Sequence, residues 1–255
     1  MHKQSPIGIF DSGLGGISVL SEIHSFLPKE DLLFLGDSKY NPYGTKTKAE
    51  ITERCIAICE WFMAQDVKAI VIACNTATSA CVDVLRKRYP IDIIGMEPAL
   101  KVACEIAPDQ KIAVWATNYT LKEKKFANLM HRFDQDYTIL RVPCPKLVEL
   151  VEKDALDQSA LIKETLEGYL AQSQAADSIV LGCTHFVFYR KMLENLVSKD
   201  VHIVDGNAGT ARHCKDVLAA KDLLNDAGGN IEFHNTLPEK IALSQKLLNE
   251  LEEEL

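Results

Sequence analysis

Residues 68–76, Lys-Ala-Ile-Val-Ile-Ala-Cys-Asn-Thr, and residues 177–185, Asp-Ser-Ile-Val-Leu-Gly-Cys-Thr-His, are the two stretches that decide the fold. In each, a short apolar run ends in a cysteine, polar side chains follow, and a segment of helical length comes next. Continuous apolar strands of this kind are typical of a parallel sheet that helices bury on both faces. The two stretches therefore predict two related halves, each with one cysteine, Cys74 or Cys183, at the carboxyl end of a strand.

Similar apolar runs recur along the chain and alternate with longer amphipathic stretches. The predicted strands are 7–10, 32–35, 69–73, 91–94, 111–115, 138–142, 178–181, 201–204 and 231–233. Such alternation indicates an α/β protein in which helices flank largely parallel sheets.

Three Thr-x-x-Glu patterns, beginning at Thr47, Thr120 and Thr236, each predict a capping box at the start of a helix. The helix predicted over 47–65 carries Cys55 and Cys59 on its apolar stripe. We expect these two thiols to pack in the core and to bind no metal.

Composition excludes several classes of protein. The chain has 255 residues, of which 47% are hydrophobic and 25% charged, so general disorder is excluded. A formal net charge of −8 disfavours a nucleic-acid surface. No apolar run approaches the roughly 18 residues needed to cross a bilayer, and residues 1–6 lack the apolar core of a signal peptide. We expect a cytoplasmic protein with free thiols and no membrane or nucleic-acid partner.

Polar residues follow five of the predicted strands, at the sheet edge where open parallel sheets bind ligands. They are Asp11-Ser12-Gly13, Gly36-Asp37-Ser38, Cys74-Asn75-Thr76, Thr117 and Cys183-Thr184-His185. His185 is a candidate proton partner for Cys183, and Asp11 is the matching candidate for Cys74.

Residues 11–16, Asp-Ser-Gly-Leu-Gly-Gly, superficially resemble a nucleotide-binding loop. The dinucleotide fingerprint requires glycine where the sequence has Ser18, and the Gly-Lys-Ser/Thr of a phosphate loop is absent. Asp11 would also repel a pyrophosphate. We expect the glycines to let the backbone come close to a small ligand, with helix N–H groups facing an anionic group such as a carboxylate.

The sequence supplies thiols, hydroxyls and amides, with no recognisable Schiff-base lysine, serine elbow or metal-ligand spacing, so we expect no cofactor and no metal. Two cysteines at equivalent strand ends suit removal of the α-proton of an amino acid and its return on the opposite face, one as thiolate and one as thiol. Hydroxyl and N–H groups would bind the substrate carboxylates. Two other classes stay open: a hydrolase using Cys183 and His185, and a binding protein for a small carboxylate, against which the missing export signal counts.

Four motifs in this order closely resemble the glutamate racemase family. They are Asp11-Ser-Gly-x-Gly-Gly16, Pro42-Tyr-Gly44, Ala73-Cys-Asn-Thr-Ala77 and Gly182-Cys-Thr-His185. The resemblance covers essentially the whole chain. It implies a cofactor-independent enzyme that interconverts L- and D-glutamate, supplies D-glutamate for bacterial peptidoglycan and commonly forms a homodimer. It also implies two similar α/β domains, over 1–97 plus 210–255 and over 98–209, with the active site in the cleft between them.

The resemblance further implies roles for individual residues. Cys74 would exchange the proton of the D-enantiomer and Cys183 that of the L-enantiomer, with Asp11 and His185 assisting and Glu152 as a further acidic residue of the site. The implied substrate-binding residues are Asp11, Ser12, Pro42, Tyr43, Gly44, Asn75, Thr76, Thr117, Thr120, Thr184 and His185.

Two positions depart from the family pattern. Glu123 and Phe126 stand where many relatives have serine and tyrosine. These two residues bear on the choice of substrate. The alternative to a glutamate racemase is therefore a racemase of another amino acid, such as aspartate. Local chemistry alone predicts only a turn at residues 41–45, so a role in substrate binding there comes from the resemblance.

Overall fold

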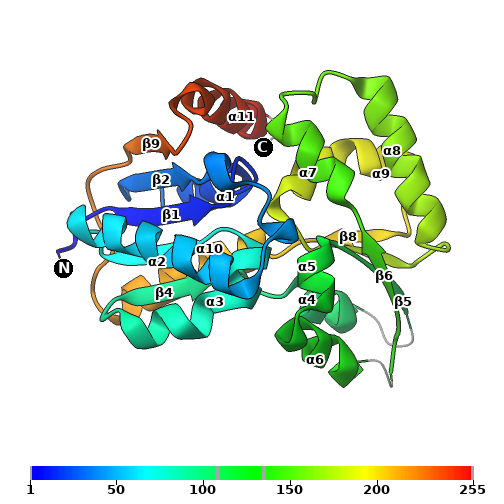
Figure 1. Ribbon diagram of the computed structural model, residues 1–255, viewed down its shortest axis with the longest axis horizontal. Coiled ribbons are helices and arrows are strands. Elements are labelled where there is room, and N and C mark those ends of the chain that lie inside the picture. Colours follow the sequence, from blue (N-terminus) through cyan, green and yellow to red (C-terminus); the bar gives the residue numbers. More distant parts are fainter. Residues whose placement is uncertain (1, 107–109, 134–135, 254–255) are drawn as a thin grey trace. The chain divides into compact units, whose positions relative to one another are not determined.

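The computed structural model describes residues 2–106, 110–133 and 136–253 (Figure 1). The chain divides into two compact units. Unit 1 comprises Met1–Glu97 and Asn207–Leu255, and unit 2 comprises Pro98–Gly206. Each unit contains one sheet whose neighbouring strands run parallel. The prediction of two parallel sheets flanked by helices is therefore confirmed.

Unit 1 contains a five-stranded sheet in the order β4-β3-β1-β2-β9. Its strands are β1 (Ile7–Asp11), β2 (Leu32–Gly36), β3 (Ala69–Ile72), β4 (Asp92–Gly95) and β9 (Ile231–Asn235). The three central strands are buried along their whole length, as expected of a parallel sheet covered on both faces.

Two groups of helices cover this sheet (Figure 1). In one group, α1 (Ile17–Phe26) packs against α10 (Asn207–Ala220) and α11 (Ile241–Glu253), and in the other α2 (Lys48–Ala64) packs against α3 (Asn75–Arg88). Three short 3-10 turns complete the unit: η1 (Ser38–Tyr40), η2 (Tyr43–Thr45) and η4 (Pro238–Lys240).

Unit 2 contains a four-stranded sheet in the order β6-β5-β7-β8. Its strands are β5 (Lys111–Ala116), β6 (Thr138–Pro143), β7 (Ser178–Leu181) and β8 (His202–Val204). Its helices are α4 (Ala99–Ile106), α5 (Asn118–Lys122), α6 (Lys124–Phe133), α7 (Pro145–Glu152), α8 (Ser159–Gln172), the 3-10 helix η3 (Thr184–Tyr189) and α9 (Arg190–Leu196).

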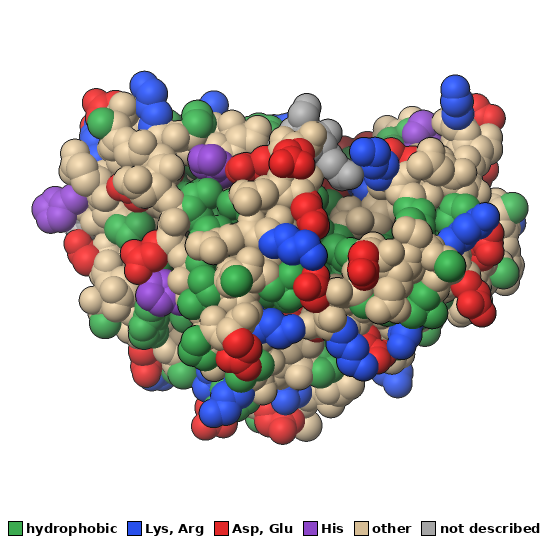
Figure 2. Space-filling view, turned by 90° about the horizontal axis from the view of Figure 1, so that it is seen from above, with side chains coloured by type: hydrophobic (Ala, Val, Ile, Leu, Met, Phe, Trp, Pro, Cys, Tyr) green, Lys and Arg blue, Asp and Glu red, His purple; other side chains and the backbone are tan. Residues whose placement is uncertain are grey.

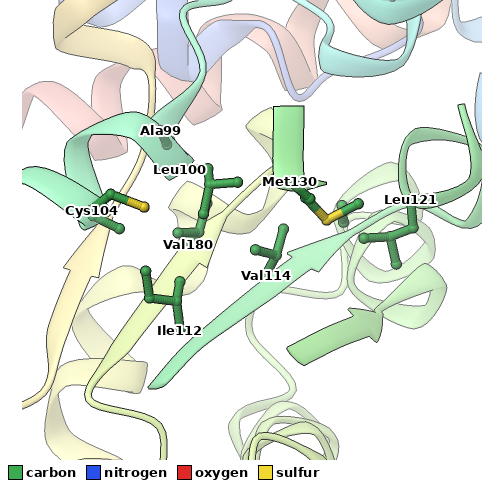
Figure 3. Packing of buried hydrophobic residues seen from close by; sticks show 10 residues of the cluster. Ala99, Leu100, Cys104, Ile112, Val114, Leu121, Met130 and Val180 are labelled. Atoms are coloured by element: carbon green, nitrogen blue, oxygen red, sulfur yellow. The ribbon is translucent and has the colours of Figure 1, made fainter. Parts of the chain in front are cut away.

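Part of the core of unit 2 lies between its central strands and helices α4 to α6 (Figure 3). Ile112 and Val114 of β5 and Val180 of β7 pack in one cluster with Leu100 of α4 and Met130 of α6. Burial of such side chains contributes about 1.5–3 kcal/mol each. The cluster thereby fixes the two strands whose carboxyl ends carry polar residues.

One of the three predicted capping boxes is confirmed. The Thr47 hydroxyl accepts a hydrogen bond from the Glu50 N–H at 3.3 Å, and the Glu50 carboxylate accepts one from the Thr47 N–H at 2.7 Å. This reciprocal pair begins α2.

The other two predicted capping boxes are wrong. In one, a different threonine is the N-cap residue, and in the other the threonine hydroxyl bonds a residue outside the helix. β5 ends at Ala116, so Thr117 caps α5 and accepts the Thr120 N–H at 3.2 Å, which leaves Thr120 inside the helix. Thr236 accepts the N–H of Lys39 at 3.0 Å, because β9 lies beside β2, and η4 separates Thr236 from α11.

The surface of the displayed face carries mixed charge. Lysine and arginine side chains alternate there with aspartate and glutamate (Figure 2). Within the described residues, every helix is too short or too polar to span a membrane.

Candidate active site

The sheet register of unit 1 brings Ser12 and Cys74 to the same edge. Phe10 of β1 lies opposite Ile72 of β3, and the Ala73 N–H donates to the Phe10 carbonyl at 2.7 Å. The residues that follow these two neighbouring strands therefore meet. The Cys74 thiol donates a hydrogen bond to the Ser12 hydroxyl at 3.7 Å, and both side chains are buried.

The carboxylate of Asp11 closes the glycine loop. Its Oδ2 atom accepts the N–H groups of Gly13 at 3.2 Å and Gly16 at 3.0 Å, while the Ser12 hydroxyl donates to Oδ1 at 3.5 Å. A Cβ atom at Gly16 would lie 2.5 Å from the Asp11 Cβ, so this close approach requires glycine. The N–H groups of Gly13 and of Gly16, which is the N-cap residue of α1, thus bind the chain's own carboxylate.

Cys74 stands immediately before α3, as the N-cap residue of this 14-residue helix. Its backbone is still extended, so the thiol leaves the strand at the point where Asn75 and Thr76 form the first turn. The amino end of a helix favours negative charge. The structure thus places the candidate substrate-binding residues Asn75 and Thr76 directly beside the thiol.

The third polar strand end of unit 1, at Asp37, forms a buried network. The Asp37 N–H donates to the Asp11 carbonyl at 2.9 Å, and its carboxylate, which is fully buried, accepts the Tyr43 hydroxyl at 2.6 Å. Arg54 of α2 donates to the same carboxylate from Nε at 3.0 Å and from Nη2 at 2.9 Å. Burial and the neighbouring Asp37 hold the pKa of Tyr43 far above its ordinary value, so its hydroxyl stays protonated.

Arg54 belongs to this network although its sequence context does not indicate it. Asp37 could be singled out because it follows a strand, but nothing near Arg54 in the sequence distinguishes it from a surface charge on α2. Its partner is 17 positions away, and only the fold brings the two together.

In unit 2, the register of β5 and β7 repeats the arrangement of unit 1. Trp115 lies opposite Leu181, and the Gly182 N–H donates to the Trp115 carbonyl at 2.7 Å. A Cβ atom at Gly182 would lie 2.8 Å from that carbonyl oxygen, so glycine is required here too. Thr117 and Cys183 consequently follow two neighbouring strands at the same sheet edge.

Cys183, His185 and Glu152 form a chain of contacts. The Cys183 Sγ atom lies 3.7 Å from the His185 Nδ1, and the His185 Nε2 lies 2.7 Å from the Glu152 Oε1. The imidazole is 2% exposed, and Glu152 ends helix α7. This geometry allows a proton to be held between sulfur and imidazole while the carboxylate orients the ring.

The helical segment predicted after Cys183 is present, and it begins as a 3-10 helix. Residues 184–189 form the 3-10 helix η3, and α9 begins only at Arg190. The tighter turn buries Phe186 and Tyr189, and the Tyr189 hydroxyl donates to the Leu147 carbonyl of α7 at 2.7 Å. This bond joins the segment that carries His185 to the helix that carries Glu152.

The remaining candidates in unit 2 are buried threonines. Thr117 donates from its hydroxyl to that of Thr120 at 3.1 Å, and Thr184 lies directly beside Cys183. The two departures from the family pattern lie nearby in the chain. Glu123 is the C-cap residue that follows α5, and Phe126 packs, partly buried, against the core cluster of unit 2. Phe126 therefore has a packing role.

All eight cysteines lie in the described part of the chain as buried free thiols. Burial raises the pKa of Cys59 and Cys214 to about 12, and that of Cys104 to about 11. At neutral pH these three are protonated and serve packing. Over the described residues, no three His, Cys, Asp or Glu side chains group as a metal site would require.

The chain is thus an α/β protein of two units, and each unit has a parallel sheet with a buried cysteine at a strand end beside a polar partner. Comparison with known proteins extends this description. The family model for Asp/Glu/Hydantoin racemase matches residues 8–214. The chain is 51% identical to the glutamate racemase of Bifidobacterium animalis subsp. lactis, over 97% of this chain and 99% of that protein.

Solved structures agree. A glutamate racemase from Bacillus anthracis superposes with a TM-score of 0.86 at 28% identity, over 97% of this chain and 95% of that one. The glutamate racemase from Francisella tularensis, solved in complex with D-glutamate, gives 0.84 at 26% identity, over 97% and 94%. The chain belongs to the Asp/Glu/Hydantoin racemase family, and it is an isomerase.

Proposed function

We propose that this enzyme interconverts L- and D-glutamate by removing and returning the α-proton, with Cys74 and Cys183 as the two acid/base groups and without a cofactor. The glutamate racemase at 51% identity supports the choice of substrate. The observation that carries the mechanism is the equivalence of the two thiols. Each follows a central strand of its own parallel sheet and each contacts a polar partner.

A two-base mechanism needs the groups in opposite protonation states, one thiolate and one thiol. In the proposal, Cys183 takes the proton of the L-enantiomer and Cys74 that of the D-enantiomer. His185, oriented by Glu152, assists Cys183. Ser12 and Asp11 have the matching position next to Cys74. The mechanism requires both half-sites to act on opposite faces of one α carbon.

In this proposal neutral donors bind the substrate carboxylates. Lysine and arginine are absent from the four recognised motifs, while Ser12, Asn75, Thr76 and Thr184 offer hydroxyl or amide groups. The Tyr43 hydroxyl donates its hydrogen bond to Asp37, so in this proposal Tyr43 contributes to substrate binding through its position. A liganded structure in which Arg or Lys pairs with both substrate carboxylates would overturn this part of the proposal.

The decisive experiment is incubation with L-glutamate in D₂O without added cofactor, after dialysis against a chelator. We expect D-glutamate that carries deuterium at Cα, because the proton returned on the opposite face comes from a thiol in exchange with solvent. Folded protein that forms no labelled D-glutamate would refute the proposal. Parallel turnover of L-aspartate decides between the two amino acids, since a higher rate on aspartate would establish the alternative substrate.

One observation favours a second function. The contacts from Cys183 to His185 to Glu152 resemble the nucleophile, base and orienting acid of a cysteine hydrolase. That function predicts an acyl-enzyme on Cys183 that mass spectrometry of a quenched reaction would detect, and it leaves Cys74 without a role.

Family membership also supports a cellular role. We propose that the enzyme is a cytoplasmic homodimer that supplies D-glutamate for peptidoglycan. Complementation of a bacterial strain that requires external D-glutamate tests the role, and light scattering of the purified protein tests the dimer. A monomer at micromolar concentration would contradict the assembly.

A further inference from the structure

We propose that Arg54 is a positioning residue for the substrate: it holds residues 37–45 in the conformation that presents Tyr43 and Gly44, a role that rests on the proposed function. The segment itself contains little regular structure. Its two 3-10 turns, η1 and η2, have three residues each. Turns of this length have poor hydrogen-bond geometry and few internal bonds. Their conformation therefore depends on side chains outside them.

Arg54 contacts the segment at two points. Its Nε and Nη2 atoms donate to the two oxygens of Asp37, at 3.0 and 2.9 Å. The centre of the same guanidinium lies 3.7 Å from the centroid of the Tyr40 ring. A planar cation that pairs in a bidentate manner and stacks at once is a combination that lysine cannot reproduce. One side chain thus fixes both the start and the middle of the segment.

Asp37 transmits this constraint to the substrate motif. Its fully buried carboxylate also accepts the Tyr43 hydroxyl at 2.6 Å, so Arg54 and Tyr43 share one acceptor. The hydrogen bond to Asp37 is the largest cause that raises the pKa of Arg54, so the side chain stays a cation. Without that cation, the buried carboxylate would keep a charge with too few partners, and the position of Tyr43 would no longer be fixed.

The anchor is rigid because Arg54 lies on α2. The capping box of Thr47 and Glu50 fixes the start of this helix, and Cys55 and Ile58 are buried on its inner face. The Arg54 side chain is 24% exposed and lines an open hollow of about 290 Å³ with Trp61 and His234. Shortening or neutralising it therefore removes no closely packed core side chain, and we expect variants at this position to fold.

The test is the Arg54→Met variant, which keeps much of the length and loses the cation and both hydrogen bonds. We expect KM for L- and D-glutamate to rise at least about ten-fold while kcat stays within about three-fold. The reason is that a segment which must become ordered on binding weakens the binding of the substrate and of the transition state equally. Both directions change together, since the two enantiomers have equal free energy in water. Arg54→Lys should recover only part of the KM.

Arg88→Met is the matched control. Arg88 pairs with Glu60 at 3.1 Å and has its guanidinium 5.7 Å from the Tyr89 ring, so the same kinds of contact are lost away from residues 37–45. Its KM should equal that of the wild type. The Tyr43→Phe variant completes a double-mutant cycle with Arg54→Met. The combined rise in KM should be smaller than the product of the single effects, because both act through Asp37.

A folded Arg54→Met variant with a KM within about two-fold of the wild type, or with a loss in kcat alone, would overturn the positioning role. If Arg54→Met does not fold, Arg54→Lys and Tyr43→Phe supply the same comparison. Amide hydrogen exchange separates this proposal from the proposed function. If the wild type fails to racemise glutamate, the proposed function fails. Exchange in residues 38–46 at least about ten-fold faster in Arg54→Met would still support the cross-link, and unchanged exchange would refute it.

Discussion

At the scale of single residues, the two candidate catalytic thiols have different partners. Cys74 contacts a hydroxyl that in turn meets the carboxylate of Asp11. Cys183 contacts an imidazole that a second carboxylate, Glu152, orients. Cys183 can exchange a proton with the neighbouring imidazole, whereas Cys74 lies beside a hydroxyl that is hydrogen-bonded to a buried carboxylate. The proposed acid/base role is thus shared by two thiols that have different hydrogen-bonding partners.

Replacement of either thiol by a hydroxyl should abolish most turnover. We expect Cys74→Ser and Cys183→Ser each to lower kcat at least about 100-fold, because a serine hydroxyl is far too weak an acid to ionise in place of the thiol and a positioned acid/base group contributes 10²–10⁴-fold. Circular dichroism should show an intact fold. Cys104→Ser, the same change in a buried thiol of the unit 2 cluster, is the control and should retain activity. Near-normal turnover in either active-site variant would exclude the two-base assignment.

At the scale of elements, the helix starts show how far local patterns determine structure. The same Thr-x-x-Glu pattern occurs three times in the sequence, and one instance forms a capping box. The Thr47 hydroxyl bonds Glu50 of the helix that it begins. Thr120 follows Thr117, which stands closer to the strand end, and the Thr236 hydroxyl accepts the N–H of Lys39 in η1. A Thr-x-x-Glu pattern therefore forms a capping box only where its threonine is the N-cap residue and its hydroxyl has no other partner.

Thr47→Ala should destabilise the protein by about 1 kcal/mol, the usual cost of a lost N-cap. Urea unfolding would measure this change. Thr52→Ala is the matched control on the same helix, because its hydroxyl bonds only the Lys48 carbonyl of the preceding turn. That variant should change stability by less than about 0.5 kcal/mol. Equal losses in the two variants would show that the reciprocal bond with Glu50 contributes nothing.

At the scale of the whole molecule, buried thiols on helices α2 and α10 of unit 1 link stability to pH. Burial raises the pKa of Cys59 and of Cys214 from an ordinary value of 9.0 to about 12. A raised pKa in the folded state means that the folded protein holds these protons more tightly than the unfolded chain. The resulting stability is fully present below pH 9 and is lost as pH rises towards 12.

We therefore expect the free energy of unfolding to fall above pH 9 with a slope of up to about 1.4 kcal/mol per pH unit for each of these thiols. Urea unfolding between pH 8 and pH 11 would measure it. Lysines and tyrosines also titrate in this range, so the comparison is with the Cys59→Ala and Cys214→Ala double variant, whose stability should decline less steeply. An identical slope in the double variant would contradict the assignment.

The sequence by itself determined the nine strands, the parallel α/β class and the two cysteines that follow buried strands. Each predicted strand is present with ends within a residue or two, because short runs of apolar residues are typical of strands in a parallel sheet that helices cover.

Only the tertiary structure decided which polar groups became partners. Glu152 meets His185 across 33 positions, Arg54 meets Asp37 across 17, and the Asp11 carboxylate accepts the N–H group of Gly16. The physical reason is competition. The burial of a strand can be predicted from the strand's own composition. A hydrogen-bonding group, in contrast, pairs with one of the groups that the sheet order brings within about 3 Å of it. That order is a property of the folded chain.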